Sequence, residues 1–494
     1  MKPLKRVLII VGVSIILTIV ILSYGIGCIF RNKETSATVT VLSTMIASAT
    51  TRFLNVSDIE NFSQIVEASY IVFKGDDGRI YAKSGDTGQI VVSDTDLGRV
   101  LQAINDREPD YKGIVVYIKP GQYEMFTGVR IARAGFSLIG AGTWDTSTSW
   151  EISNCRQCYF GTLILLRNDN VTYFDVGFQD VNRPARLYMA GFGAVASSSD
   201  ISWTQHMNSV FLYMRNWMRH TTLERIFIRN VGRGIKHEVT QSGFTGMQDV
   251  YIHKVAVESP YYTGLELRGG GYNLRVVDFY TGWNINAGSS VFYIYGFEDV
   301  WIDKLWILGL NPPYSQTTIG ATIYSCKKVF VRDLIIRGVS SYWALRILSS
   351  SNVLVDGAFI NLDGGDVPNL IRVENSSNVM LRNIYGIYTQ NPIYISNSTL
   401  FMENVRLVNK NTNVEYRSEN SGVATIPAEQ TRVTVTHNLI ATPTKFQITP
   451  LAQPPGKIWV ENITPTSFDI VMDTAINENL NISWYADLHT QKIL

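Results

Sequence analysis

Hydrophobic and polar positions repeat through the middle of the chain with a period of 21 to 29 residues. The repeat can be indexed on apolar anchor residues, which are Ile226, Val250, Leu274, Val300, Val329, Val353, Val379 and Leu400. In most repeats the positions at 0, +2, +5 and +7 from the anchor are apolar, as in Val300, Ile302, Leu305 and Ile307. This spacing predicts two short strands that meet at a two-residue corner, which is the unit of a β-solenoid. Val171, Tyr173, Val176 and Phe178 fit the same template, so we expect solenoid coils over about residues 160–410.

The segments on either side of the repeat predict smaller elements. Gly-Asp-Asp-Gly at 75–78 and Gly-Asp-Thr-Gly at 85–88 are turn signals between short antiparallel strands. Asp94 can cap a helix over 94–106, whose apolar face is Leu97, Val100, Leu101 and Ile104. Beyond residue 420, alternating segments separated by Pro and Asn turns predict a β-sandwich.

The sequence from this helix onward resembles a known family. Three short segments resemble the start of the β-helix in the pectate-lyase-like superfamily, which includes many phage tailspikes. They are Gln102-Ala103-Ile104, the run from Val115 through Pro120-Gly121-Gln122-Tyr123, and Leu138-Ile139-Gly140-Ala141-Gly142-Thr143. The resemblance covers residues 94–143 and implies a right-handed parallel β-helix whose open end is covered by a short helix. It also implies a homotrimer. Val435 to Pro443 resembles C-terminal modules of tail fibres and of related phage and archaeal-virus proteins.

The N-terminal segment predicts a membrane anchor. Residues 7–30 carry no charge and are long enough to span a bilayer, with Lys2, Lys5 and Arg6 before them and Arg31 and Lys33 after them. A cleaved signal or a lipoprotein signal ending at Cys28 is the alternative, and either places the remaining chain outside the cell or on a virion surface. The expected organisation of this all-β protein is an anchor or signal at 1–33, a stalk at 34–69, a hairpin module at 70–93, the solenoid at 94–420 and the C-terminal β-sandwich at 421–494.

Charge and cysteine content exclude several classes of function. The chain has 43 basic and 42 acidic residues without a long run of one sign, so no nucleic-acid partner is expected. Cys155 and Cys158 form a single CxxC without a second ligand pair, so we expect a loop there and no metal site. The Asp363-Gly364-Gly365-Asp366 segment most simply forms a turn. Because it places two aspartates in one loop, calcium is the one cofactor left open.

The repeat register converts the sequence into a map of the solenoid surface, because residues at equal offsets stack about 4.8 Å apart. The outward row at +1 reads Phe227, Tyr251, Arg275, Trp301, Phe330, Leu354, Met380 and Phe401. A second outward row at +6 contains Tyr280, Trp306, Ile335, Phe359 and Tyr385. Exposed aromatic stripes of this size are normally covered, by loops of the same chain, by another subunit or by a stacked sugar. The candidate sugar-binding residues are therefore Tyr251, Trp301, Phe330, Tyr280, Trp306 and Arg332.

Carboxylates in the same map are the candidates for catalysis. The corner row at +3 reads Asp303, Arg332, Asp356, Arg382 and Glu403, which predicts a ladder of ion pairs. Asp303 and Asp356 lie two rungs apart, near the spacing of inverting glycosidases, although Arg332 between them would keep both ionised. Asp249 and Asp278 are further candidates, because they fall on neighbouring coils with Glu258, Glu266, His253 and Arg268. The alternative is scattered surface charge, and the Gly-His-Gly signature of polygalacturonases is absent.

These observations lead to the hypothesis of a surface β-helix that binds extracellular or cell-surface polysaccharide. One version is an adhesin or viral receptor-binding spike. A second is a depolymerase, either a polysaccharide lyase or a glycoside hydrolase, and a third is a structural envelope protein. Whether the chain is an enzyme stays open at this point, because no converging catalytic group is evident from the sequence.

Overall fold

The computed structural model describes residues 68–142, 161–178, 184–196, 207–240, 246–282, 290–308, 319–337, 343–361, 369–388 and 390–488, together with the backbone of 491–493. All of them belong to one compact unit, Glu67–Leu494. The proposed membrane segment at 7–30, Cys155 to Cys158 and Asp363 to Asp366 lie outside the described residues. Among the helices of the described part, none is long and apolar enough to cross a membrane.

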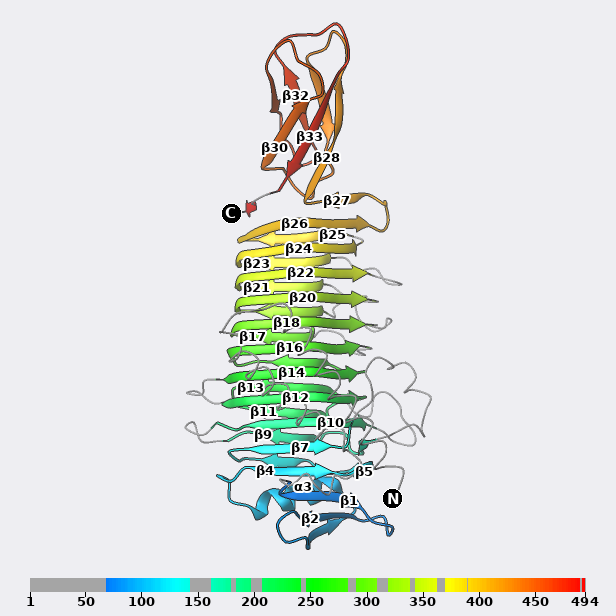
Figure 1. Ribbon diagram of the computed structural model, residues 1–494, viewed down its shortest axis with the longest axis vertical. Coiled ribbons are helices and arrows are strands. Elements are labelled where there is room, and N and C mark those ends of the chain that lie inside the picture. The colour runs from blue at the N-terminus through cyan, green and yellow to red at the C-terminus, as the bar shows by residue number, and fades with distance from the viewer. Residues whose placement is uncertain are drawn as a thin grey trace, which may run out of the picture. The chain divides into compact units, whose positions relative to one another are not determined.

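Two parallel sheets form the solenoid (Figure 1). We name the first the long-strand sheet; its strands are β10 (Leu187–Ala196), β12 (Met218–Arg229), β14 (Met247–Glu258), β16 (Gly271–Gly282), β18 (Phe297–Leu308), β20 (Lys327–Arg337), β22 (Ser351–Asn361), β24 (Ser377–Tyr388) and β26 (Ser398–Asn409). We name the second the short-strand sheet; its strands are β6 (Val129–Ile131), β9 (Thr172–Val176), β11 (Val210–Arg215), β13 (Arg233–Glu238), β15 (Thr263–Leu267), β17 (Ser290–Tyr295), β19 (Ile319–Tyr324), β21 (Trp343–Leu348), β23 (Asn369–Glu374) and β25 (Asn391–Ser396). The prediction of a parallel β-solenoid is confirmed, while its right-handed winding stays a prediction.

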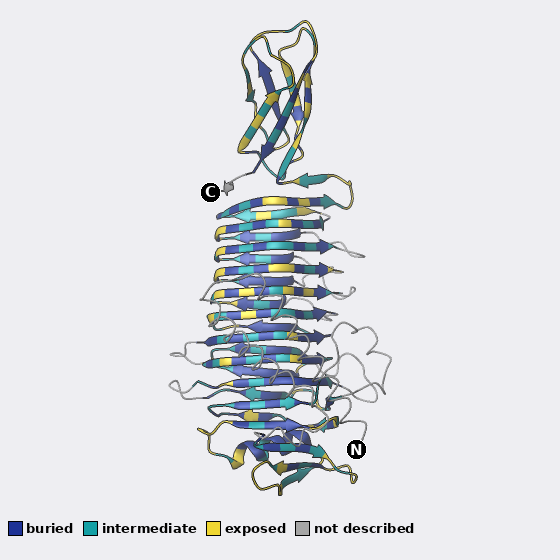
Figure 2. Ribbon diagram, in the orientation of Figure 1, coloured by how far each residue is buried: buried dark blue, intermediate teal, exposed yellow. Residues whose placement is uncertain are grey.

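The predicted corner lies inside each long strand. Positions +2 and +5 both point inward, so two consecutive outward residues interrupt the alternation that a straight strand would follow. The residue at +4 has a positive φ in coil after coil, as at Lys304 (56°), Asp333 (54°), Gly357 (76°) and Asn383 (55°). This left-handed conformation turns the strand without breaking the rung pairing. Figure 2 shows the resulting bands of buried and exposed residues along the long strands.

The sequence pattern predicts Ile226 as the anchor of its coil, and this prediction is wrong, because the residue equivalent to the other anchors is Thr221. Thr221 pairs with Val250, whereas Ile226 pairs with Val255. The true anchor escaped the hydrophobic pattern because it is a threonine, although its side chain is fully buried. Phe227 therefore leaves the +1 row and enters the +6 row, where it pairs with Ala256. The Val171 template is also wrong, because β9 pairs with β6 and β11 in the short-strand sheet.

A line of small side chains stabilises the turn that leads into the long strands. The backbone N–H of Cys326 donates to the hydroxyl of Ser350, that of Ser350 to Ser376, and that of Ser376 to Ser398, at 3.0 to 3.1 Å. We call these four residues the turn ladder. Each bond runs from one coil to the next, so the turn of each coil is completed by its successor. The N–H of Val405 donates in turn to Ser418, which leads into the C-terminal module.

The N-terminal end of the solenoid is covered as the sequence predicts, with one correction. β1 (Tyr70–Lys74), β2 (Ile80–Ser84) and β3 (Ile90–Asp94) form an antiparallel meander, and β1 continues in parallel into β4 (Ile114–Ile118). β5 (Gly121–Met125), β7 (Phe136–Gly140) and β8 (Thr162–Leu166) extend the larger sheet toward β10. The predicted apolar face of helix α3 (Leu97–Arg107) is buried.

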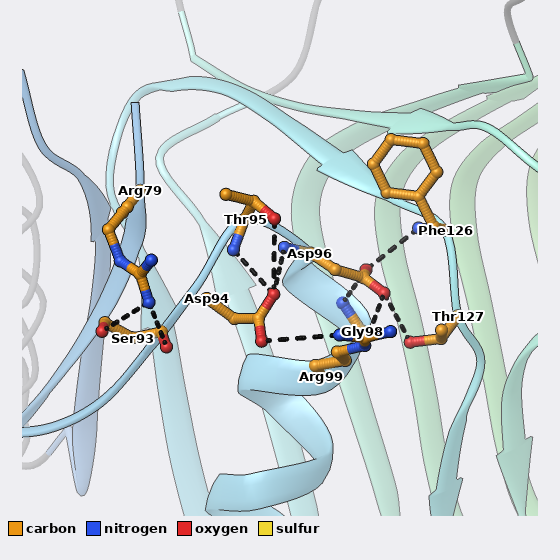
Figure 3. Close-up of polar contacts among 9 residues, drawn as sticks. All are labelled: Arg79, Ser93, Asp94, Thr95, Asp96, Gly98, Arg99, Phe126 and Thr127. Carbon is orange, nitrogen blue, oxygen red and sulfur yellow. Dashed lines mark hydrogen bonds and ion pairs between the residues drawn. The ribbon is translucent and has the colours of Figure 1, made fainter. Parts of the chain in front are cut away.

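The N-cap of α3 is Asp96, and the prediction of Asp94 is wrong. The buried carboxylate of Asp96 accepts hydrogen bonds from the N–H of Gly98 (2.9 Å), the N–H of Phe126 (2.9 Å) and the hydroxyl of Thr127 (2.7 Å) (Figure 3). It therefore connects the helix to the chain that follows β5. Asp94 instead accepts from the N–H groups of Thr95 and Asp96 and orders the turn before the helix.

After β26 and the short β27 (Glu415–Arg417), the chain forms two antiparallel three-stranded sheets. The first consists of β28 (Glu419–Ile426), β33 (Leu480–Asp487) and β30 (Lys445–Pro450). The second consists of β29 (Arg432–Thr436), β32 (Ser467–Met472) and β31 (Ile458–Glu461). Phe468 of one sheet contacts Trp484 of the other at 5.5 Å between ring centroids. β34 (Gln491–Ile493) returns to pair with β26.

Candidate functional site

Two of the predicted sugar-binding aromatic residues contact each other in the +1 row of the long-strand sheet. Trp301 and Phe330 occupy successive rungs, and their ring centroids lie 4.3 Å apart. Trp301 is 42% exposed, so one edge or face of its ring meets solvent. Tyr251 lies two rungs earlier in the row, where its ring stacks on His253 at 5.5 Å. The rings of Trp301 and Phe330 thus form a continuous aromatic surface, with Arg275 between them and Tyr251.

The side chains of the +6 row are not equally exposed to solvent. Trp306 is 42% exposed, on the same strand as Trp301. Tyr280, one rung earlier, packs against the buried pair Phe227 and Ala256. Of the two predicted contacts in this row, Trp306 is therefore the more accessible, and Tyr280 contributes mainly to packing.

The corner row forms two of the predicted ion pairs. Arg332 contacts the carboxylate of Asp303 through Nε at 3.0 Å and Nη2 at 2.5 Å. Arg382 donates from Nη2 to Asp356 at 2.6 Å, and this hydrogen bond lowers the pKa of the Asp356 carboxyl below its ordinary value. A general acid needs a raised pKa, so the environment of Asp356 does not favour that role.

Asp249 and Asp278 occupy different positions of their coils and do not converge. Asp249 precedes the anchor of β14, where its carboxylate accepts from Asn273 at 2.7 Å and lies 3.4 Å from His220. Asp278 is the +4 corner residue of β16. Both have a positive φ, at 54° and 55°, which is a structural reason for an aspartate at each position.

The two glutamates grouped with them by sequence also separate. Glu258 ends β14 beside Arg229, with 3.4 Å between Oε2 and Nε, and burial raises its carboxyl pKa. Glu266 lies on the short-strand sheet. The structure thus divides the predicted carboxylate group between two sheets.

Glu266 belongs to a charged cluster that the sequence analysis did not identify. We define the Glu266 cluster as Arg233, Lys236, Glu238, Glu266 and Arg268. Glu266, with its side chain only 8% exposed, forms ion pairs with Arg268 at 2.5 Å and with Arg233 at 3.5 Å. Lys236 pairs with Glu238 at 2.8 Å. These residues lie on β13, on β15 and directly after β15, facing away from the solenoid core.

Burial and neighbouring charges shift two pKa values within the Glu266 cluster. Burial and the negative charge of Glu266 raise the pKa of the Glu238 carboxyl. Burial lowers the pKa of the Lys236 ammonium, and Arg233, Arg268 and Arg215 lower it further against the opposing effect of Glu266. Both shifts disfavour the charged form, and such groups are frequent at binding and catalytic sites.

A separate alignment of the short strands would have identified this cluster. Their inward pairs are Ile235 and His237 on β13, Leu265 and Leu267 on β15, and Phe292 and Ile294 on β17. The residue between each pair points outward and gives the row Lys236, Glu266, Tyr293. Indexing on the long-strand anchors hid this row, because the number of residues between a long strand and the next short strand changes from coil to coil.

The described ranges contain no group of three or more His, Cys, Asp or Glu side chains placed to hold a metal ion. Cys326 is buried as a free thiol within the turn ladder. What the described surface offers chemically is therefore aromatic faces, guanidinium and ammonium groups, and carboxylates with shifted pKa values.

No protein family and no curated protein matches the chain in sequence. Solved structures that match include the Dettilon tailspike protein, at 7% identity over 76% of this chain and 88% of that chain, with a TM-score of 0.24. The tailspike of Acinetobacter baumannii bacteriophage Fri1, a capsular polysaccharide depolymerase, matches at 10% identity over 79% and 82%, with a TM-score of 0.22. A tailspike double mutant of E. coli bacteriophage HK620, in complex with a pentasaccharide, matches at 9% over 81% and 91%, with a TM-score of 0.28.

These TM-scores are low, so the assignment of the fold rests on the rung-by-rung strand pairing of this chain. The pairing is parallel from β10 to β26 in one sheet and from β6 to β25 in the other. The chain has a parallel β-solenoid fold that matches phage tailspike proteins structurally, at low sequence identity.

Proposed function

We propose that this chain is a surface β-solenoid that binds an extracellular or cell-surface polysaccharide, as an adhesin or a viral receptor-binding spike. The observation that carries the proposal is the placement of Trp301 and Trp306 on one strand, each 42% exposed, with the ring of Phe330 in contact with that of Trp301. A contiguous exposed aromatic surface, unlike a single exposed ring, often marks a binding site. Their flat faces suit sugar rings, and the regular rungs repeat the contact along a linear polymer.

The candidate contact residues for this polymer are Tyr251, Trp301, Phe330, Tyr280, Trp306 and Arg332. Among them, Trp301, Phe330 and Trp306 are expected to contribute most, because Tyr280 is engaged in packing and Arg332 is paired with Asp303. Arg332 remains about half exposed and can donate to a sugar hydroxyl from the edge of its ion pair.

Glycan-array binding by the full-length chain tests this proposal. Trp301→Ala and Trp306→Ala are each expected to lower the affinity for the selected glycan by up to about tenfold, because stacked aromatic contacts contribute roughly 0.5 to 1.5 kcal/mol. Tyr111→Ala is the matched control, since Tyr111 is 78% exposed and lies outside both aromatic rows. The proposal fails if no glycan binds, or if the two tryptophan variants bind as the parent does.

One observation favours a second function, which is cleavage of the bound polysaccharide. The raised carboxyl pKa values of Glu238 and Glu258 are of the kind that a general acid requires. The sequence candidates Asp303, Asp356, Asp249 and Asp278 remain proposals for this activity. Incubation with neutral and acidic polysaccharides, with and without calcium, followed by assays of reducing ends and of unsaturated products, would detect a hydrolase or a lyase.

The setting of the protein is also a proposal. It comprises an anchor or signal at 1–33, which reaches the membrane through residues 7–30, a stalk at 34–69, a hairpin module at 70–93, the solenoid at 94–420 and the C-terminal module at 421–494. Membrane attachment with an exposed extracellular bulk and placement on a virion surface both fit this arrangement. A homotrimer would compete with sugar for the Trp301 surface, so light scattering of the parent and of Trp301→Ala distinguishes the two roles. A purely structural envelope protein would retain the trimer and bind no glycan.

A further inference from the structure

The outer face of the short-strand sheet differs in chemistry from that of the long-strand sheet. Its first outward row pairs along successive rungs as Asp175, Tyr213, Lys236, Glu266, Tyr293, Thr322, Arg346, Arg372 and Tyr394. The residues two positions further along these strands include Arg215, Glu238, Arg268, Tyr295, Tyr324 and Glu374. Cations, carboxylates and tyrosines therefore alternate along this face, whereas the +1 and +6 rows of the long-strand sheet are mainly aromatic and aliphatic.

Tyrosine rings hold several of these cations in place. The guanidinium of Arg215 lies 4.0 Å from the ring centroid of Tyr213, and Lys236 lies 4.6 Å from the same ring. Arg268 lies 4.9 Å from the ring of Tyr293. A ring beneath a cation restricts its motion while its remaining donors stay available to a ligand. The cations of this face are thus partly preorganised, which lowers the entropy lost on binding.

Positive charge is in excess where these side chains gather. Around Lys236 lie Arg215, Arg233 and Arg268, while the carboxylates are Asp175, Glu238 and Glu266. Four cations thus share three carboxylates among the described residues of this region. The crowding is visible in Lys236 itself, because the three guanidinium groups all lower its ammonium pKa. An anion bound here would relieve that repulsion.

The cationic side chains differ in exposure, and that of Lys236 is the least exposed of the four, at 20%. The Arg268 side chain is 55% exposed and that of Arg215 is 38% exposed. Tyr295, on the rung after Arg268, is 38% exposed and contacts Tyr324 at 5.0 Å between ring centroids. Charged donors and an aromatic surface therefore lie side by side on this face.

We propose that the outer face of the short-strand sheet binds an acidic polysaccharide, with Arg268 and Lys236 contacting sugar carboxylates and Tyr295 and Tyr324 stacking on neighbouring sugar rings. This inference rests on the proposed function only in taking a polysaccharide as the ligand. It adds the chemical class of the sugar and assigns it to a different surface from Trp301 and Trp306.

Carboxylates interleaved with the cations favour such a polymer over a nucleic acid. Asp175, Glu238, Glu266 and Glu374 lie among the cations of this face and would repel the dense phosphates of a nucleic acid backbone. A polysaccharide whose acidic sugars are separated by neutral ones places its charges further apart, so each can meet a cation between two protein carboxylates. The class expected is thus one with carboxylates spaced by uncharged sugars.

Binding of the full-length chain to hyaluronan, whose disaccharide repeat carries a single carboxylate, tests the proposal directly. Its fully methyl-esterified form is the matched neutral polymer, and single-stranded DNA is the matched dense polyanion. We expect hyaluronan to bind, with affinity decreasing as salt increases, and the ester to bind about tenfold more weakly or less. Equal binding of the ester, or binding of DNA as tight as that of hyaluronan, would overturn the proposal.

Substitutions place the binding on this face. Arg268→Gln removes one exposed cation and is expected to lower hyaluronan affinity by about tenfold. Arg99→Gln removes a comparably exposed cation from helix α3, outside both proposed binding surfaces, and should have no effect. Tyr295→Glu and Tyr295→Gln differ only in charge at an exposed position. The glutamate variant is therefore expected to bind more weakly than the glutamine variant without any difference in folding.

The outcomes separate this inference from the proposed function. Loss of glycan-array binding in Trp301→Ala with unchanged hyaluronan binding supports two independent surfaces. If a glycan binds through Trp301 but hyaluronan does not bind, the inference is wrong and the proposed function stands. If hyaluronan binds and neither Arg268→Gln nor Tyr295→Glu changes its affinity, the assignment to this face is wrong.

Discussion

Arg382 donates a hydrogen bond to Asp356 across one rung of the long-strand sheet, with 2.6 Å between Nη2 and Oδ2. The lowered pKa of Asp356 has a defined consequence for stability, since the folded chain binds this proton more weakly than the unfolded chain does. The contribution of this carboxylate is present above its ordinary pKa of 3.8 and is lost as the pH falls through the lowered value.

Asp356→Asn should therefore lower the midpoint of denaturant unfolding at pH 7, and the difference from the parent should be smaller at pH 3, below the ordinary pKa of this carboxyl. Parallel urea unfolding of the two proteins at both pH values measures this. Asp303→Asn, which leaves the Arg382 pair intact, reports the effect of removing a neighbouring corner carboxylate. A stability difference that is larger at pH 3 than at pH 7 would contradict the assignment.

The corner of the β24 coil provides a test of backbone conformation. Asn383 has a φ of 55°, and its side chain donates to Asp356 and accepts from Asn404, both at 2.8 Å. Asn383→Ala and Asn383→Gly remove the same hydrogen bonds, but only alanine resists the positive φ. We expect alanine to lower the free energy of unfolding by on the order of 1 kcal/mol more than glycine does. Gly357 already occupies the equivalent corner one rung earlier, so equal effects of the two variants would show that the corner relaxes.

Removal of the Asp96 carboxylate should weaken the N-terminal cover of the solenoid. Asp96→Ala leaves the N–H groups of Gly98 and Phe126 without this acceptor, at a cost of about 2 kcal/mol. The measurement is the unfolding midpoint, together with protease sensitivity of the segment before β4. Asp86→Ala, at an exposed turn in the same module, is the control and should behave as the parent does.

His237 should make the solenoid sensitive to mild acid. Its imidazole is fully buried, and this burial lowers the pKa from 6.5 to about 4. The unfolded chain therefore binds the proton more tightly, so the stability contributed by the neutral ring is complete above pH 6.5 and falls as the pH decreases toward 4. The loss can reach about 3 kcal/mol.

His237→Leu is the matched variant, because Met214 and Leu267 occupy the same inward row on the neighbouring rungs. We expect it to flatten the decrease in unfolding midpoint between pH 6.5 and 4, at the cost of the hydrogen bond between His237 and the carbonyl of Asn216. A parent and a variant with the same pH profile would show that another group controls acid unfolding.

The long-strand sheet was predictable from sequence because its inward positions are almost all aliphatic. The prediction failed at Thr221, where a buried hydroxyl interrupts the hydrophobic pattern and Ile226 offers an equally regular frame. The alternation of apolar and polar residues cannot show whether Thr221 or Ile226 is the anchor, since the positions at +5 and +7 are as apolar as those at 0 and +2. Only the pairing with Val250 fixes the register.

The candidate site was less predictable than the fold. Trp301, Phe330 and Trp306 followed from the rung spacing, because stacked residues share an offset within one sheet. The positions of Glu238 and Glu266 follow from the short strands. The number of residues between these strands and the anchors varies with the intervening segments, so the two positions could not be predicted in the same way. Their proximity to Lys236 and Arg268 also depends on side-chain direction, which the sequence does not specify.

The turn ladder gives the solenoid a direction of assembly. The N–H of Ser350 remains without its acceptor until the coil that contains Ser376 is in place, and Ser376 depends in the same way on Ser398. Over the coils of the turn ladder, the coil most recently synthesised is thus the one with an unfinished turn, and the next coil completes it. Ser398 is the last acceptor of the ladder, and the hydroxyl of Ser418 accepts instead from Val405 within β26. A chain truncated between two of these coils would therefore end in an unfinished turn, whose free N–H group another polypeptide could bind.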